Sequence, residues 1–320
     1  MEQYPFTLLI LLMLALALGS KQNWGMAIER NPEYKYQPLS GRELATQLDI
    51  GLLARATDLR RRHGVTPRLE ILSNNEAHGP SLKYVGMKEK VGKRLGFIVN
   101  SNYVTTSSQL DDSIHEFNLN PEVHGIIVQL PLKDDEPFSD LVNNIAPTKD
   151  VDGLGRMPLY APATPTAIRR ILRGNGFDYV KKPTVLNGLG TLVNLPLLGE
   201  MQQEGAHHVS VIDEHTPKDE RYEQLNEAFI IISAVGKEVL DVGDFSIEAF
   251  EHTKVIVDAG TAEVKKGGGE KVIHGDVTEE LRLRMPDHWF ASESIGGVGP
   301  LTIRSLLANV ALSAESLVEQ

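Results

Sequence analysis

The chain has 320 residues, of which 41% are hydrophobic, enough for about two domains that each bury a core. Its 43 acidic and 32 basic residues give a formal net charge of −11, which argues against a protein that grips a nucleic-acid backbone. Cysteine is absent and the ten histidines show no ligand spacing, so we expect no disulfide, no thiolate nucleophile and no metal centre.

Residues 1–25 form an apolar N-terminal extension. The run 6–19 is almost wholly apolar and would span about 21 Å as a helix, less than the ~30 Å hydrocarbon core of a bilayer. Its length fits the apolar region of a signal peptide, but Glu2 stands where a basic residue is expected. Two interpretations stay open. In the first, the extension is disposable, the natural start is Met26 and the protein is cytoplasmic. In the second, the run 6–19 exports the protein or tethers it to a membrane.

Helices and strands alternate through the first half of the chain. The apolar spacing predicts helices over 42–62, 81–95 and 107–117, and strands over 68–73, 97–100 and 124–132. Within the last strand, Ile126, Ile127 and Val128 form a continuous apolar run typical of a parallel strand covered on both faces. Strands separated by amphipathic helices indicate a parallel α/β sheet. The proline-rich segment 146–166 then indicates a linker or a functional loop.

The same alternation resumes in the second half. It predicts a helix from Pro165, a helix opened by Gly188–Thr191, a final helix over 301–317, and strands over 184–187, 208–212, 229–234 and 254–258. We therefore predict two α/β domains, the second a Rossmann-like dinucleotide-binding domain. The first would comprise residues 26–163 together with the C-terminal segment 300–320, and the second residues 164–299.

Three polar positions in the first half are candidates for chemistry. Tyr84 and Lys88 are four residues apart and share a helix face, so they could form a proton-transfer pair if the lysine pKa is lowered, or be ordinary surface residues. Gln129 follows the apolar strand at its carboxyl end, where it could contact a ligand or hold a loop. Asp152 lies in a loop bounded by proline and glycine, where an acid could bind a metal, orient a cationic group or cap a turn.

The second half contains a degenerate dinucleotide fingerprint. Gly188, Leu189, Gly190 and Thr191 follow a strand and match the first two glycines of a G-x-G-x-x-G turn, whose backbone amides approach a pyrophosphate. Val193 occupies the place of the third glycine. The next strand ends in the acids Asp213 and Glu214, which would bind a ribose 2′-hydroxyl and repel a 2′-phosphate.

Five segments, taken in order, carry a family resemblance over about residues 38–316. They are Ser81–Lys90, His124–Leu132, Pro147–Gly153, Pro162–Pro165 and Gly296–Thr302. Together they resemble the bifunctional methylenetetrahydrofolate dehydrogenase/methenyltetrahydrofolate cyclohydrolase family. The resemblance implies two linked reactions of one-carbon metabolism, which serves purine biosynthesis. They are oxidation of 5,10-methylenetetrahydrofolate by a nicotinamide cofactor and hydrolysis of the methenyl product to 10-formyltetrahydrofolate.

The resemblance also implies a role for each candidate. Lys88 would be the general acid/base, Tyr84 would stack on the substrate or bond to it, and Gln129 would orient Lys88. Asp152 would accept hydrogen bonds from the pterin ring. The other implied substrate-binding residues are Val128, Leu130, Pro131, Gly296, Gly297, Val298, Gly299, Pro300 and Thr302.

The cofactor would be NAD or NADP, and this half departs from the family pattern. The implied cofactor-binding residues are Thr164, Gly188, Leu189, Gly190, Thr191, Asp213, Glu214, Gly236, Gly260 and Thr261. The family's Gly-Arg-Ser turn is Gly-Leu-Gly here, its later glycine is Asn194, and its Asp-Val-Gly-Ile-Asn is Asp-Ala-Gly-Thr-Ala at 258–262. Losing one charged phosphate contact costs roughly ten- to a hundredfold in affinity. We therefore expect NAD to be favoured over NADP, or the dehydrogenase to be weakened.

Two other functions stay open. One is a cyclohydrolase-only or folate-binding protein with a degenerate dinucleotide site, and the other is an unrelated Rossmann oxidoreductase in which Lys88, Gln129 and Asp152 are incidental. The resemblance further implies a homodimer, an active site in the cleft between the domains, and tetrahydrofolate derivatives as partners. Membrane contact is expected only if the apolar run 6–19 is retained.

Overall fold

The structure, a computed structural model, describes residues 31–75, 80–133, 137–241, 243, 245–265 and 271–319. The chain divides into two units, Met1–Tyr34 and Lys35–Gln320, and the architecture described here is that of the second. The predictions about residues 1–25, about the run 6–19 and about a start at Met26 lie outside the described residues.

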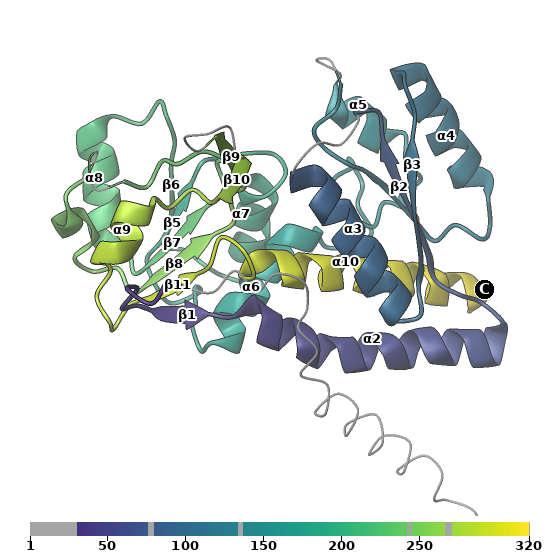
Figure 1. Cartoon of the computed structure of the whole chain (residues 1–320), viewed down its shortest axis with the longest axis horizontal. Helices are drawn as coiled ribbons and strands as arrows, with labels where there is room; N and C mark the ends of the chain where they lie inside the picture. Colours follow the sequence, from purple (N-terminus) through teal and green to yellow (C-terminus); the bar gives the residue numbers. More distant parts are fainter. Residues whose placement is uncertain are drawn as a thin grey trace, which may run out of the picture. The chain divides into compact units, whose positions relative to one another are not determined.

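The first half of this unit is built on a three-stranded parallel sheet in the order β3-β2-β4 (Figure 1). The strands are β2 (Arg68–Ser73), β3 (Ile98–Tyr103) and β4 (Gly125–Val128), and the helices are α2 (Gly41–His63), α3 (Pro80–Arg94), α4 (Ser107–Leu119) and α5 (Phe138–Asn143). The helices and strands predicted here are present, with ends shifted by a few residues. The fully buried β4 explains the unbroken apolar run that predicted it.

The second half forms a six-stranded parallel sheet in the order β1-β11-β8-β7-β5-β6. Its strands are β1 (Gln37–Leu39), β5 (Thr184–Asn187), β6 (Val209–Ile212), β7 (Ile230–Ser233), β8 (Val255–Asp258) and β11 (Phe290–Ser292). Around it lie α6 (Ala163–Gly174), α7 (Asn194–Gln203), α8 (Lys218–Glu227), η1 (Ile247–Phe250), α9 (Glu279–Arg284) and the hairpin β9 (Ala262–Lys265)–β10 (Lys271–His274). The four predicted strands are β5 to β8, and the Rossmann-like sheet is confirmed.

The edge of this sheet holds a feature that the sequence did not predict. β1 pairs in parallel with β11, and β11 pairs with β8. Residues 37–39 therefore lie in the sheet of the second half, although they fall within the predicted first domain, 26–163. β1 and β11 have only three residues each, too few to show an apolar period.

Two long helices, α2 and α10 (Val298–Val318), pack against each other and serve both hydrophobic cores (Figure 1). Ala45, Val298 and Leu301 belong to the core of the second sheet. Leu52 and Leu307 belong to the core of the first sheet. Within the described part of the chain, only α10 has the length and hydropathy of a membrane span, and most of it is buried in these cores.

Candidate active site

The two candidate residues Lys88 and Gln129 are in direct contact. Lys88, on α3, donates from Nζ to Oε1 of Gln129 at 2.8 Å. The amide nitrogen of the same glutamine donates to the carbonyl of Leu130 at 2.9 Å, so its oxygen is held toward the amine. Gln129 follows β4, and its backbone N–H donates to Leu72 on the adjacent β2. The sheet therefore fixes the position of the glutamine that bonds to Lys88.

The electrostatic surroundings of Lys88 favour proton exchange. Burial lowers the pKa of Lys88, and the carboxylate of Asp152 opposes part of that shift. Burial also raises the pKa of Asp152, which the lysine charge opposes in turn. An amine that is easier to deprotonate than a solvated lysine can take a proton from water and return it. The structure thus brings three of the four predicted catalytic residues to one place.

Two neighbours of Asp152 hold its loop in position. The buried carboxylate of Asp150 accepts hydrogen bonds from the backbone N–H groups of residues 153, 154 and 155. Lys149 donates from Nζ to three carbonyl oxygens, those of Phe117, Asn118 and Asn120. The carbonyl of Lys149 accepts from Ile126 of β4, which ties the loop to that strand. Turn capping, one of the roles open to an acid here, is therefore performed by Asp150.

Tyr84, the fourth candidate, lies beside the glycine-rich start of α10. A Cβ built on Gly299 would come within 2.7 Å of the Tyr84 hydroxyl, so a larger residue there would force the tyrosine to shift. Burial raises the pKa of Tyr84, and a side-chain hydrogen bond with Thr261 opposes that shift. Thr261, predicted for the cofactor, therefore contacts a residue predicted for the substrate. The other implied folate-side residues lie at the end of β4 and along the start of α10: Val128, Leu130, Pro131, Gly296, Gly297, Val298, Pro300 and Thr302.

The loops that follow β5 and β7 meet at the carboxyl edge of the second sheet. Gly188 has a φ of +82°, and a Cβ there would lie 2.8 Å from Cγ2 of Val235. A Cβ built on Gly190 would meet no heavy atom nearer than the carbonyl oxygen of Ala234, at 4.0 Å. This leaves room for a ligand beside Gly190. Leu189 and Thr191 are exposed in this turn, and Thr164 is half-buried in the first turn of α6.

The helix after this turn begins later than predicted. The sequence places its start at Gly188–Thr191, but α7 begins at Asn194, and Val193 has the non-helical φ and ψ of −130° and −72°. Asn194 is buried, and its Nδ2 donates to the carbonyls of Asn187 and Gly188 at 2.9 and 2.7 Å. Its Oδ1 has no hydrogen-bond partner among the described residues. The side chain thus binds the end of β5 in place of a further helical turn.

The two acids after β6 are arranged differently from each other. Oδ1 of Asp213 accepts from the N–H groups of His215 and Thr216 at 2.9 and 3.0 Å, and these bonds help lower the pKa of Asp213. Glu214 is exposed. Asp213 is therefore held as an anion in a local turn, where it would disfavour a phosphate.

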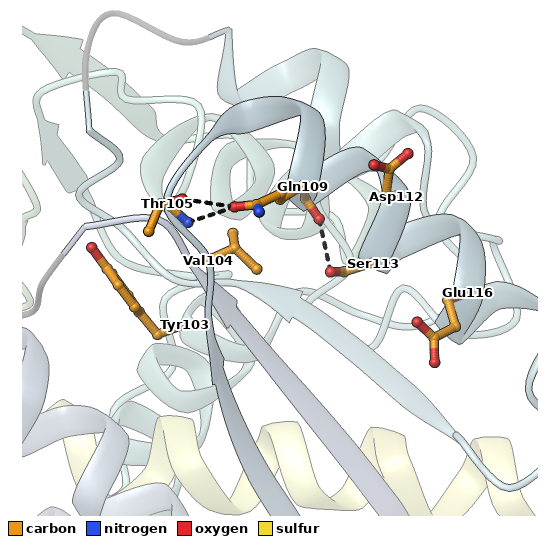
Figure 2. A pocket seen from close by; sticks show the side chains of 7 residues that line it. All are labelled: Tyr103, Val104, Thr105, Gln109, Asp112, Ser113 and Glu116. Carbon is orange, nitrogen blue, oxygen red and sulfur yellow. Dashed lines mark hydrogen bonds between the residues drawn. The ribbon is translucent and has the colours of Figure 1, made fainter.

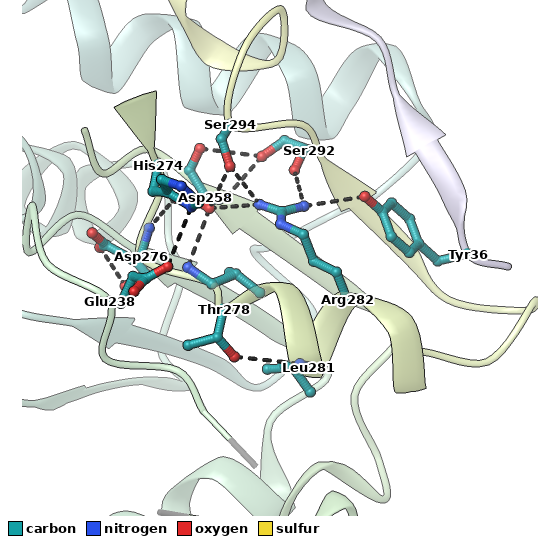
Figure 3. Close-up of polar contacts among 12 residues, drawn as sticks. Tyr36, Glu238, Asp258, His274, Asp276, Thr278, Leu281, Arg282, Ser292 and Ser294 are labelled. Atoms are coloured by element: carbon teal, nitrogen blue, oxygen red, sulfur yellow. Dashed lines mark hydrogen bonds and ion pairs between the residues drawn. The ribbon is translucent and has the colours of Figure 1, made fainter. Parts of the chain in front are cut away.

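Sequence reasoning missed a buried polar cluster at the same sheet edge (Figure 3). It comprises Asp258, at the end of β8, with Asp276, Arg282, Tyr36, Ser292 and Ser294. Gly260 lies against it, because a Cβ there would be 1.8 Å from Oδ1 of Asp276. The only signal in the sequence for this cluster is the pair Gly275-Asp276. An acid after a glycine is too common to identify a functional residue.

Two surface cavities are lined by none of the predicted site residues. The one in Figure 2 measures about 360 Å³ and is lined by Tyr103, Val104, Thr105, Gln109, Asp112, Ser113 and Glu116, none of them a predicted site residue. A second, of about 430 Å³, contains the structural Asp150 with Arg156 and Met157. Among the described residues, no group of three or more histidine or acidic side chains could hold a metal ion.

Comparisons with known proteins cover nearly the whole second unit. Residues 39–152 match the catalytic domain, and residues 162–318 the NAD(P)-binding domain, of tetrahydrofolate dehydrogenase/cyclohydrolase. The chain is 32% identical over 296 residues to the "Bifunctional protein FolD" of Helicobacter hepaticus, spanning 88% of this chain and 98% of the relative.

Solved structures show the same likeness. The bifunctional methylenetetrahydrofolate dehydrogenase/cyclohydrolase of Campylobacter jejuni superposes with a TM-score of 0.74 at 26% identity, covering 88% of this chain and 99% of that one. The Trypanosoma brucei enzyme, solved with NADP and an inhibitor, gives a TM-score of 0.76 at 25% identity over 89% and 99% of the two chains.

Proposed function

Since the chain belongs to the tetrahydrofolate dehydrogenase/cyclohydrolase family, we propose that it oxidises 5,10-methylenetetrahydrofolate and hydrolyses the methenyl product to 10-formyltetrahydrofolate. The observation that carries the proposal is the hydrogen bond from Lys88 to Gln129, beside Asp152. An amine, an amide and a carboxylate from three separate segments converge there. That convergence disfavours an unrelated oxidoreductase, in which these residues would be incidental.

Lys88 is the group that moves protons in the hydrolytic half. As a neutral amine it takes a proton from the water that adds to the methenyl carbon, and as an ammonium it gives that proton to the folate nitrogen when the ring opens. The remaining hydroxyl proton is released as the formyl C=O forms. Gln129 holds the amine in line, and Asp152 favours its charged form while its carboxylate accepts hydrogen bonds from the pterin.

The dehydrogenase half uses a nicotinamide dinucleotide, which accepts the hydride when bound. The room beside Gly190 and the positive φ of Gly188 fit such a group, and Gly188, Gly190 and Thr191 would hold it. We propose NAD rather than NADP, because Leu189 supplies no cation and Asp213 would repel a 2′-phosphate. NADP is the cofactor in the trypanosomal structure.

We assign the folate site to residues 26–163 with 300–320 and the dinucleotide site to 164–299. We also propose a cytoplasmic homodimer without a nucleic-acid partner, in keeping with the net charge of −11. The exposed side chains of Ile98 and Tyr103 on the edge strand β3 offer it a contact surface. Membrane contact would require that the run 6–19 be retained.

A second candidate is a cyclohydrolase or folate-binding protein that has lost dinucleotide binding. The late start of α7 at Asn194 favours it, because a displaced helix N-terminus aims fewer amides at a pyrophosphate. The open space at Gly190 favours the bifunctional enzyme.

Two assays on the purified protein separate these functions. Formation of reduced nicotinamide from 5,10-methylenetetrahydrofolate, followed by its absorbance with NAD or NADP, reports the dehydrogenase. Loss of methenyl absorbance without any cofactor reports the cyclohydrolase. We expect both activities, with the higher kcat/KM for NAD. Methenyl loss alone would establish the second candidate, and the absence of both would overturn the proposal.

A further inference from the structure

The carboxylate of Asp276 is fully buried and binds one loop at several points. It accepts hydrogen bonds from the backbone N–H groups of Val235, Gly236 and Lys237 at 2.6, 2.8 and 3.1 Å, and from the Ser233 hydroxyl at 2.6 Å. Gly236 has a φ of +79°, which turns the three amides toward one point. Successive N–H groups arranged in this way form an anion-binding concavity, and here the anion is a side chain of the protein itself.

The loop held by Asp276 shapes the dinucleotide turn. The side chain of Val235 occupies the space beside Gly188, where a Cβ would lie 2.8 Å from it. On the other side, Gly260 passes so close to Asp276 that only glycine fits. The loops after β5, β7 and β8 therefore meet around one carboxylate. Ligands of open α/β sheets bind at this carboxyl edge.

A second set of contacts fixes Asp276 from behind (Figure 3). Its backbone N–H donates to Oδ1 of Asp258 at 2.9 Å. Asp258 is paired with Arg282 at 2.6 Å, and that guanidinium also donates to the hydroxyl of Tyr36 at 3.1 Å. Both ends of Asp276 are thus anchored, which leaves its carboxylate little freedom to follow the loop.

We propose that Asp276 is a positioning residue of the dinucleotide site, whose carboxylate holds the loop 235–237 against the turn 188–190 before the cofactor binds. Such preorganisation removes the cost of ordering the loop on binding. The inference rests on the proposed dehydrogenase function. It concerns the dinucleotide half alone, so the cofactor-independent hydrolysis at Lys88 serves as an internal reference.

The test compares Asp276→Asn with wild type by calorimetric titration of NAD and NADP and by both activity assays. The amide places an N–H₂ group against N–H donors, so we expect the cofactor Kd to rise about ten- to a hundredfold. The KM for the dinucleotide should rise with it. The cyclohydrolase rate and the KM for methylenetetrahydrofolate should stay within about twofold of wild type, because Lys88 and its partners lie at a different site.

Glu70→Gln is the matched control. Glu70 is also buried, in β2, and among the described residues its side-chain donors all lie on the first sheet: Arg68, Asn100 and Asn102. Glu70→Gln likewise replaces a buried carboxylate oxygen by an N–H₂ group, so we expect a loss of thermal stability with an unchanged cofactor Kd. If Glu70→Gln weakens the cofactor as much as Asp276→Asn does, the effect is general destabilisation and the inference fails.

Ser233→Ala provides a milder variant should Asp276→Asn fold poorly. It removes one donor to the carboxylate and should raise the cofactor Kd several-fold, whereas an unchanged Kd would count against the inference. Wild-type affinity in Asp276→Asn would overturn this inference alone. If the wild type bound neither dinucleotide, the dehydrogenase proposal would fail, and this inference with it.

Discussion

Lys88 has its protonation set by two opposing effects. Burial favours the neutral amine, and the charge of Asp152 favours the ammonium. The side-chain oxygen of Gln129 accepts a hydrogen bond from Nζ of Lys88, and both the amine and the ammonium can donate it. A general acid/base works best when neither form is strongly preferred near the working pH, and the lowered pKa of Lys88 moves the amine in that direction.

Replacement of Lys88 by Met tests the role of the amine directly. The side chain keeps its length but can no longer carry a proton, so we expect the cyclohydrolase kcat to fall about 10²- to 10⁴-fold. Steady-state measurement of methenyl loss provides the readout. Lys93→Met, on the same helix but with an exposed side chain, should keep wild-type activity. Near-normal hydrolysis by Lys88→Met would remove the amine from the mechanism.

The charge of Asp152 should be visible in the pH profile. Asp152→Asn removes the anion that favours the ammonium, so the pKa of Lys88 falls further. The neutral amine is then populated at lower pH, and the rising limb of cyclohydrolase kcat against pH should move toward acid. The measurement is kcat at saturating substrate across the pH range. Asp58→Asn, at an exposed carboxylate on α2, should leave the limb in place. A shift toward alkaline pH in Asp152→Asn would contradict the assignment.

Site residues could be predicted from the sequence where a motif surrounds them. Lys88, Gln129 and Asp152 each lie in a recognisable segment, and the structure brings them together. Asp276 could not be found in this way, because its role depends on where a distant loop folds back. The function of a carboxylate that binds backbone amides is a property of the fold and leaves no local pattern.

At the scale of the element, the start of α7 is the clearest difference from expectation. A glycine turn followed by apolar residues predicts a helix that begins at once, yet the helix begins only at Asn194. The amide of this side chain satisfies two carbonyls at the end of β5 and competes with the first helical turn.

Asn194→Gly should therefore tighten dinucleotide binding. Without the side chain, residues 191–193 can join α7 and direct their amides toward a pyrophosphate. We therefore expect the NAD Kd to fall several-fold, a gain in binding free energy of roughly 1 kcal/mol. Fluorescence titration of the free enzyme measures this change. Asn175→Gly, at the C-terminus of α6, is the matched control and should not alter the Kd. Weaker binding by Asn194→Gly would mean that the observed turn is the one suited to the cofactor.

The elements that could be predicted are those long enough to show a period. The buried strands β4, β7 and β8 each contain three consecutive branched apolar residues, and α2 has an apolar stripe from Leu44 to Leu59, over about four turns. β1 and β11 are each three residues long; β1 pairs with β11, and β11 also pairs with β8. No local pattern could have shown that partnership.

At the scale of the whole second unit, α2 and α10 join the two cores. Asp49 of α2 pairs with Arg304 of α10 and also with Arg94 of α3, so the helix that carries Lys88 is tied to both. Elements shared between two sheets make it costly for one sheet to unfold while the other stays folded. We therefore expect one cooperative unfolding transition.

Leu307→Ala tests this coupling. Leu307 is fully buried in the core of the first sheet, so its truncation should cost about 2–5 kcal/mol. In a Trp24→Phe background, fluorescence reports only Trp289, which is buried near the second sheet. Urea unfolding followed by this fluorescence and by far-ultraviolet circular dichroism should shift together. A fluorescence transition that did not move would show that the two sheets unfold independently.

The pairing of β1 with β11 constrains how the protein is made. Synthesis on the ribosome proceeds at roughly 5–20 residues per second, so Gln37 emerges many seconds before its neighbour Phe290 exists. During that interval α2 also lacks α10, so the core that Leu52 and Ala56 share with the first sheet stays incomplete. The nascent polypeptide cannot complete either core until translation has almost finished, because residues of β11 and α10 belong to them.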